Sequence, residues 1–146
     1  MNLEGPALTL VLQSRVAHLA TADLRGRPHV VPICYAYDAG HFYFVIDRKP
    51  KSKFRELKRL RNIRENPHVA MVIDRYDDDW NRLAFVLVRG LAEVIHDEGQ
   101  WAAAVTLLRQ RYPGYRSMLL NFHENPTIRI TCQKYHFWCA SPPAVG

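Results

Sequence analysis

The sequence predicts a mainly β fold, in which six antiparallel strands form a small barrel and helices occur at only two of the crossings. Apolar runs are short, and turn-forming segments such as 25–28 (RGRP) and 38–40 (DAG) separate them, a pattern typical of hairpin-linked strands. Strands and helices do not alternate regularly along the chain, as a doubly wound α/β fold would require. A closed antiparallel barrel therefore fits the pattern better.

The strands are predicted from alternating or continuous apolar runs bounded by turn residues. Gly90 interrupts the fifth strand and marks a bend or bulge there. A short helix is expected from near Pro6 to Gln13, because proline is favoured at the first position of a helix. The predicted strands cover residues 16–22, 29–37, 41–46, 68–76, 83–88 continued by 91–95, and 127–138.

Two longer helices are predicted at the crossings. The first covers residues 52–65, with Ser52 as its N-cap, and ends at Asn66-Pro67. The second begins after Asp97, which forms a capping box with Gln100, and ends at Pro113-Gly114, with a short helix expected over 115–122. Their apolar faces comprise Phe54, Leu57, Leu60 and Ile63 in the first helix and Trp101, Val105, Leu108 and Tyr112 in the second.

The composition narrows the class of protein. With 146 residues and 48% hydrophobic content, the chain is expected to form one domain over residues 1–146. It has no apolar run of membrane-spanning length, and residues 1–13 lack the basic start of a secretory signal, so we expect a cytoplasmic protein that does not insert into a membrane. Three widely spaced cysteines form no zinc or disulfide pattern, and no metal site is expected. The net charge of +6 indicates an anionic partner, such as nucleic acid, an acidic membrane surface or a phosphorylated small molecule.

The segment 42–67 combines a strand, a basic turn and a predicted helix start. The apolar run 42–46 is followed by 47–50 (DRKP), and then by Lys51, Ser52 and Lys53. The first N–H groups of a helix and its dipole favour an anion, and charge-assisted hydrogen bonds from lysines strengthen such a site. These residues suit a phosphate, although a solvated and capped helix start would show the same pattern.

Several short motifs in this order and spacing are similar to those of a known family. They are Leu19-Ala20-Thr21, Gly26-Arg27-Pro28 with Pro32, Phe42–Asp47 with Lys51-Ser52-Lys53, Arg61-Asn62-Ile63, Asn66-Pro67, Asp74-Arg75-Tyr76 with Trp80, and the strand around Val88–Gly90. On this basis, residues 8–138 resemble the pyridoxamine 5'-phosphate oxidase-like, flavin-binding split β-barrel family. Within it they most resemble the branch of deazaflavin (coenzyme F420)-dependent enzymes.

The resemblance implies a six-stranded antiparallel split β-barrel of the FMN-binding type, and a homodimer with two cofactor sites at the subunit interface. The strand before the basic turn would run along the cofactor ring, the strand around Pro32 would contact its other side, and the basic turn would hold the phosphate. Trp80 and the strand near Trp138 are the groups expected from the second subunit. The implied cofactor contacts are Val31, Pro32, Ile33, Val45, Ile46, Asp47, Lys51, Ser52, Lys53 and Trp80.

The resemblance also implies a function. We expect an oxidoreductase that transfers hydride between bound F420 and a small electron-poor substrate, with flavin mononucleotide (FMN) in an oxidase or flavin carrier as the alternative. The cofactor carries such chemistry, so no side-chain nucleophile is needed, and the catalytic residues remain unassigned. The substrate-phosphate residues of pyridoxamine oxidase proper have no match near the C-terminus, so oxidation of pyridoxamine phosphate itself is not expected.

Two further hypotheses concern the basic and aromatic residues of the same region. Arg55, Lys58, Arg59 and Arg61 would suit the acidic tail of a deazaflavin as a group, although each alone is equally a solvated helix residue. A remote alternative is a nucleic-acid-binding module that uses this basic helix, with Phe42, Tyr43 and Phe44 as a stacking platform. No recognised nucleic-acid-binding motif supports it, so we expect a small-molecule substrate and no nucleic-acid partner.

Overall fold

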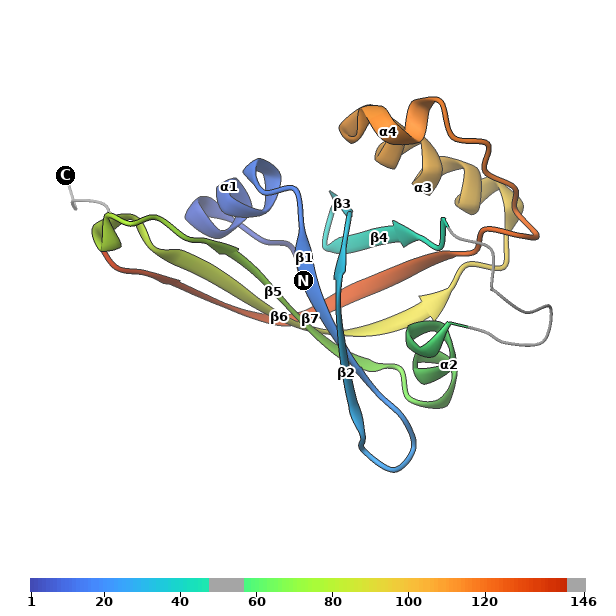
Figure 1. The fold of residues 1–146 in the computed structure, drawn as a ribbon, viewed down its shortest axis with the longest axis horizontal. Coiled ribbons are helices and arrows are strands. Elements are labelled where there is room, and N and C mark those ends of the chain that lie inside the picture. The colour runs from blue at the N-terminus through green and yellow to red at the C-terminus, as the bar shows by residue number, and fades with distance from the viewer. Residues whose placement is uncertain (48–56, 142–146) are drawn as a thin grey trace.

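A computed structural model describes residues 1–47 and 57–141 of the chain. Within this part, seven strands form one antiparallel sheet in the order β2-β1-β5-β6-β7-β4-β3 (Figure 1). The mainly β, curled fold expected from the sequence is confirmed, with one strand more than predicted. The strands are β1 (Ala17–Ala22), β2 (Pro28–Ile33), β3 (Ala36–Asp38), β4 (His41–Val45), β5 (His68–Arg75), β6 (Ala84–Val94) and β7 (Thr127–Cys139).

The helices pack against the sheet, and the first two contribute buried residues to its core, among them Val11 and Ile63 (Figure 1). No helix in the described ranges is long and apolar enough to cross a membrane. The helices are α1 (Gly5–Gln13), α2 (Lys58–Glu65), α3 (Glu98–Arg111) and α4 (Pro113–Arg116), and a 3₁₀ turn, η1 (Trp80–Arg82), joins β5 to β6.

The extra strand arises because the predicted strand 29–37 is two strands on opposite edges of the sheet. Only Cys34 and Tyr35 join β2 to β3, so the sheet must curl until its two edges meet. At this break the backbone N–H of Tyr35 donates to the Tyr112 hydroxyl over 3.0 Å. The fully buried Tyr35 hydroxyl donates to the Val11 carbonyl over 2.6 Å. Side chains thus replace the ladder hydrogen bonds that a continuous strand would make.

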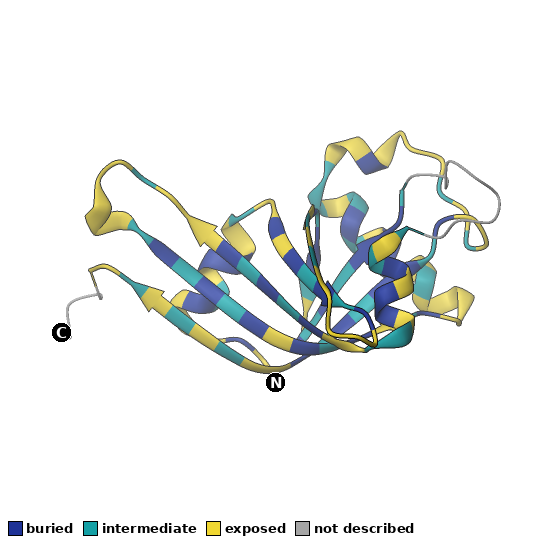
Figure 2. Ribbon diagram, turned by 60° about the horizontal axis from the view of Figure 1, so that its bottom comes forward, coloured by how far each residue is buried: buried dark blue, intermediate teal, exposed yellow. Residues whose placement is uncertain are grey.

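Buried and exposed positions alternate along the strands (Figure 2), and the buried ones form one core with residues of α1 and α2. Phe42 and Phe44 of β4 are only 0% and 2% exposed. These two rings belong to the core and cannot stack on bases, so the proposed nucleic-acid stacking platform is wrong. Other large core residues are Leu19, Met71, Ile73, Val86, Val88, Ile128 and Ile130.

Two helix boundaries differ from the predictions. Helix α2 begins at Lys58, after an extended Leu57 (φ −60°, ψ 144°), and not at Ser52. Ser52 itself lies outside the described residues. The short helix expected over 115–122 is instead α4, which begins at Pro113. Proline starts this helix where it was expected only to end the preceding one, since Pro is well tolerated in a first helical turn.

The bulge predicted at Gly90 is confirmed, because the β6–β7 register shifts between Arg89 and Gly90. A Cβ atom at Gly90 would lie 2.5 Å from the backbone oxygen of Thr131. We expect Gly90→Ala to lower the free energy of unfolding by about 1–3 kcal/mol, the usual range for overpacking. Denaturant unfolding measures this loss. Gly114→Ala is the control, since a Cβ atom at Gly114 would meet nothing within 4 Å; equal stability losses in both variants would contradict the bulge packing.

Asp23 holds the β1–β2 turn and the start of α2 together. Its carboxylate accepts backbone hydrogen bonds from Arg25 and Arg27, pairs with the Arg27 side chain at 2.7 Å, and lies 3.6 Å from the Lys58 ammonium. The backbone hydrogen bond from Arg27 is the main cause that holds the pKa of Asp23 well below its ordinary value, and burial opposes it. The turn is thereby tied to the first residue of α2, close to the pocket described below.

This lowered pKa predicts how stability depends on pH. Unfolded Asp has a pKa of about 3.9, so the contribution of Asp23 is complete above that value and is lost as pH falls toward the lower folded pKa. The difference in unfolding free energy between wild type and Asp23→Asn should stay constant from about pH 7 to pH 5 and narrow below about pH 4. Denaturant unfolding across this range tests it. A gap that is unchanged down to about pH 3 would contradict a charge-based contribution.

Candidate functional site

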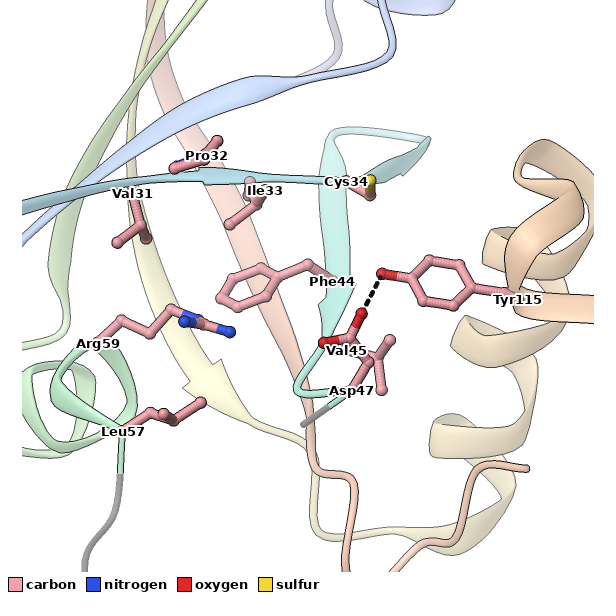
Figure 3. Close-up of a pocket in the computed structure, with 10 residues that line it drawn as sticks. All are labelled: Val31, Pro32, Ile33, Cys34, Phe44, Val45, Asp47, Leu57, Arg59 and Tyr115. Carbon is pink, nitrogen blue, oxygen red and sulfur yellow. Dashed lines mark hydrogen bonds between the residues drawn. The ribbon is translucent and has the colours of Figure 1, made fainter. Parts of the chain in front are cut away.

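A pocket of about 360 Å³ opens where β2, β4, the start of α2 and α4 come together (Figure 3). It lies beside the break between β2 and β3, where the curled sheet brings its edges close to each other. Ten residues line it: Val31, Pro32, Ile33, Cys34, Phe44, Val45, Asp47, Leu57, Arg59 and Tyr115.

Most of the pocket wall is apolar. Val31 and Ile33 of β2 share one face of that strand, because side chains two residues apart point the same way. Phe44 and Val45 come from β4, and Leu57 from the extended residue before α2. Such a wall, with a few polar groups placed on it, is typical of pockets for small molecules and cofactors.

The polar groups stand on two sides of the pocket. On the α4 side, the Tyr115 hydroxyl donates to Oδ2 of Asp47 over 3.3 Å, and Cys34 lies nearby. On the α2 side, the guanidinium of Arg59 reaches toward the space beside Phe44 (Figure 3). The pocket therefore presents an acceptor from one wall and a donor from the other.

Burial and the Asp47 charge together control the ionisation of the neighbouring groups. Burial, and then the negative charge of Asp47, raise the pKa of Tyr115 above its ordinary value. The same two causes raise the pKa of the Cys34 thiol, and Arg111 opposes them in part. Both groups are protonated at neutral pH, so Cys34 is not an activated thiolate nucleophile.

The structure brings five of the expected cofactor contacts to this pocket: Val31, Pro32, Ile33, Val45 and Asp47. Ile46 does not line it. Ile46 is 3% exposed, its N–H donates to the Pro126 carbonyl, and its own carbonyl accepts from the Asn125 side chain.

The other expected contacts lie elsewhere. Trp80 sits in η1 between β5 and β6, is 69% exposed, and does not line the pocket of its own chain. Lys51, Ser52 and Lys53, together with Arg55, lie outside the described residues. The phosphate-binding role of the basic turn therefore stays a prediction from the sequence.

Sequence reasoning assigned no such place to Cys34, Phe44, Leu57 or Tyr115. Tyr115 follows Pro113-Gly114, and its hydroxyl reaches Asp47 across 68 residues of sequence. Nothing in local periodicity predicts such a pairing, because it depends on how α4 folds back toward the end of β4. Arg59 was grouped with the basic residues of its segment, and its place in the pocket distinguishes it from them.

The other described members of the basic group pair with acids. Lys58 lies 3.6 Å from Asp23, and the Arg61 side chain lies 3.4 Å from Glu65. Among the members of this group that the structure describes, Arg59 is the one that lines the pocket.

The described residues contain no group of three or more His, Cys, Asp or Glu side chains arranged to hold a metal ion. The acidic segment 77–79 forms a turn, in which the Asp77 side chain accepts from the Asp79 N–H and lies 3.2 Å from the Arg82 side chain. The three cysteines are all free thiols.

The fold agrees with the comparison to known families. The family model described as pyridoxamine 5'-phosphate oxidase matches residues 4–139, and the chain therefore belongs to this family. A comparison with curated protein sequences finds no match.

Solved structures of similar fold bind different groups. An FAD-binding protein from Mesorhizobium loti is 23% identical, with a TM-score of 0.69, and the match covers 92% of this chain and 94% of that one. A protein described as an F420 reductase is 24% identical, with a TM-score of 0.64, and the match covers 92% and 98% of the two chains. The haem storage protein HutZ from Vibrio cholerae is 15% identical, with a TM-score of 0.70 and 95% of each chain covered. At these identities the likeness establishes the fold and not the ligand.

Proposed function

We propose that this protein binds a flavin-type cofactor in the pocket between β2, β4, α2 and α4, and that it is an oxidoreductase. The observation that carries the proposal is the pocket itself, in a chain of this family. Its walls are apolar, and a carboxylate and a guanidinium stand on opposite sides. A planar ring with polar edges suits this combination.

The residues present fit such a cofactor. Val31, Ile33 and Val45 offer apolar surface to a ring, Asp47 offers an acceptor, and Arg59 a donor. A reduced deazaflavin, when bound, supplies a hydride to an electron-poor substrate, whereas FMN would allow oxidase chemistry or simple carriage. The side chains of this pocket would bind and orient the ring and exclude water from one side of it.

We favour coenzyme F420, with FMN as the alternative. The support is the motif pattern of the sequence and the likeness to a structure described as an F420 reductase. The basic group gives less support than the sequence alone implied, because Lys58 and Arg61 lie beside acidic side chains and do not line the pocket, whereas Arg59 does line it. The assignment of Lys51, Ser52 and Lys53 to the cofactor phosphate belongs to the same proposal.

Haem is a weaker candidate for this pocket. A haem iron in proteins is usually held by His, Cys thiolate, Met or Tyr. No histidine is among the described residues that line the pocket, burial and the charge of Asp47 keep the Cys34 thiol protonated, and the Tyr115 hydroxyl is hydrogen-bonded to Asp47.

The proposal includes a homodimer with the cofactor at the subunit interface. A pocket of about 360 Å³ is near the lower end of the range for drug-sized ligands, so a tricyclic ring with its ribityl phosphate chain would extend beyond it. A second copy is a suitable cover, and the exposed aromatic side chains of Trp80 and Trp138 are candidates to contribute to it.

Titration of the purified protein with F420 and, separately, with FMN tests the proposal through quenching of cofactor fluorescence. Saturable binding of F420 with much weaker binding of FMN supports the reductase. Preference for FMN supports an oxidase or flavin carrier of the same fold. Absence of saturable binding for both would contradict the proposed function.

A further inference from the structure

Asp47 provides the single carboxylate among the residues that line the pocket in the described part of the chain. It follows the buried strand residues Val45 and Ile46, and its side chain is half buried beside Tyr115 and Cys34. A half-buried carboxylate in an apolar wall is costly unless hydrogen-bond donors satisfy it. Each of its two oxygens can accept more than one hydrogen bond.

Tyr115 satisfies only one side of this carboxylate. Its hydroxyl donates to Oδ2 over 3.3 Å, and it is the hydrogen-bond partner of Asp47 within residues 1–47 and 57–141. The Tyr115 side chain is itself 7% exposed and packs edge-on against the Tyr112 ring. Tyr115 therefore holds Asp47 in place through Oδ2, and among the described residues no donor occupies Oδ1, which can accept a hydrogen bond from a ligand.

The opposite wall has the opposite character. Arg59 extends from α2 toward the pocket beside the Phe44 ring, on the side opposite Asp47 (Figure 3). A ligand that spans the pocket therefore meets an acceptor at one end and a cation at the other. An anionic group is repelled at the Asp47 end and attracted at the Arg59 end.

We infer that Asp47, held by Tyr115, accepts a hydrogen bond from the imide N–H of the cofactor's pyrimidine-dione ring, and that this contact decides which edge of the ring enters the pocket. The inference rests on the proposed function and assigns a specificity-determining side chain within it. Flavin and deazaflavin rings share this N–H, so the contact serves both. The phosphate-bearing end of the cofactor then points toward α2 and not toward α4.

A pair of ligands that differ only at this N–H tests the inference. The probes are FMN and its N3-methyl derivative or, should only the deazaflavin bind, F420 and its N3-methyl derivative. Wild-type protein at neutral pH should bind the unmethylated ligand about 10- to 100-fold more tightly, the range of a hydrogen bond to a charged group. Asp47→Ala should remove this preference, and Asp47→Asn, which keeps an acceptor oxygen, should retain part of it.

Two further variants complete the design. Tyr115→Phe should weaken the preference several-fold, and Asp74→Ala, at an exposed carboxylate of β5, should leave it unchanged. Equal binding of both probes by wild type, or an unchanged preference in Asp47→Ala, overturns the inference while leaving cofactor binding in place. Failure of both unmethylated cofactors to bind overturns the proposed function and the inference together.

Discussion

Replacing Val31 by tryptophan is expected to weaken cofactor binding by about 100-fold or more, which corresponds to about 2.7 kcal/mol. Val31 lies on β2, is only partly buried, and its side chain points into the pocket beside Arg59 (Figure 3). An indole at this position would occupy the space proposed for the ring. Because the side chain would enter an open pocket and not a close-packed core, we expect the free energy of unfolding to fall by less than the roughly 1–3 kcal/mol that overpacking of a core usually costs.

Fluorescence titration and denaturant unfolding of the same preparation separate the two effects. Leu24→Trp is the control, since Leu24 is 78% exposed at the β1–β2 turn and does not line the pocket. It adds a similar bulk to the surface and should leave cofactor affinity unchanged. Full affinity in a folded Val31→Trp protein would show that the cofactor binds elsewhere.

Arg111→Ala is expected to lower the free energy of unfolding by about 2–4 kcal/mol, because several charge-assisted hydrogen bonds are lost together. The Arg111 guanidinium donates to the carbonyls of Val11, Leu12 and Ser14 at the end of α1. It also lies 4.9 Å from the centre of the Tyr35 ring. The last carbonyls of a helix have no partner within the helix. Without Arg111 these carbonyls would lose their hydrogen bonds, and a buried carbonyl without a hydrogen bond lowers the free energy of unfolding.

This side chain also supports the pocket, since it joins α1 and α3 at the break between β2 and β3. Denaturant unfolding measures the loss. Arg116→Ala is the control, because Arg116 donates only to the carbonyls of Arg109 and Gln110 on the surface, and we expect it to cost less than about 1 kcal/mol. Equal losses in the two variants would contradict a special role for Arg111 in closing the sheet.

Local features of the fold could be predicted from the sequence because short-range chemistry determines them. The bulge at Gly90 and the start of α3 at Asp97 follow from residue types at fixed spacing. The Asp97 side chain accepts a hydrogen bond from the Gln100 N–H, as the capping box predicts. The Gln100 side chain, however, accepts a hydrogen bond from Arg129.

Features that depend on distant contacts could not be predicted in this way. The break at Cys34 and Tyr35 leaves the apolar alternation of the strand intact, and it becomes visible only through contacts to Val11 and Tyr112. The start of α2 at Lys58 likewise departs from a three-residue apolar spacing that continues across Leu57.

In the candidate site, too, local features could be predicted and features that depend on distant contacts could not. The motif order predicted contacts on β2 and at the end of β4 with the residues just after it, and five of these residues line one pocket. Tyr115 and Arg59 could not be placed there, since α4 and the start of α2 reach the pocket only through the tertiary fold. The backbone of Ile46 was expected along the ring, but Ile46 belongs to the core, and its N–H and carbonyl are bonded to Pro126 and Asn125.

The pocket between β2, β4, α2 and α4 is the place proposed for the ring of a flavin-type cofactor. A crystal structure of the protein with F420 or FMN bound would locate the ring without any assumption about the reaction. We expect the ring in contact with Val31 and Val45, with its imide edge at Asp47. A ring bound instead on the other face of the sheet, in the hollow lined by His68 and Arg89, would contradict the proposed function.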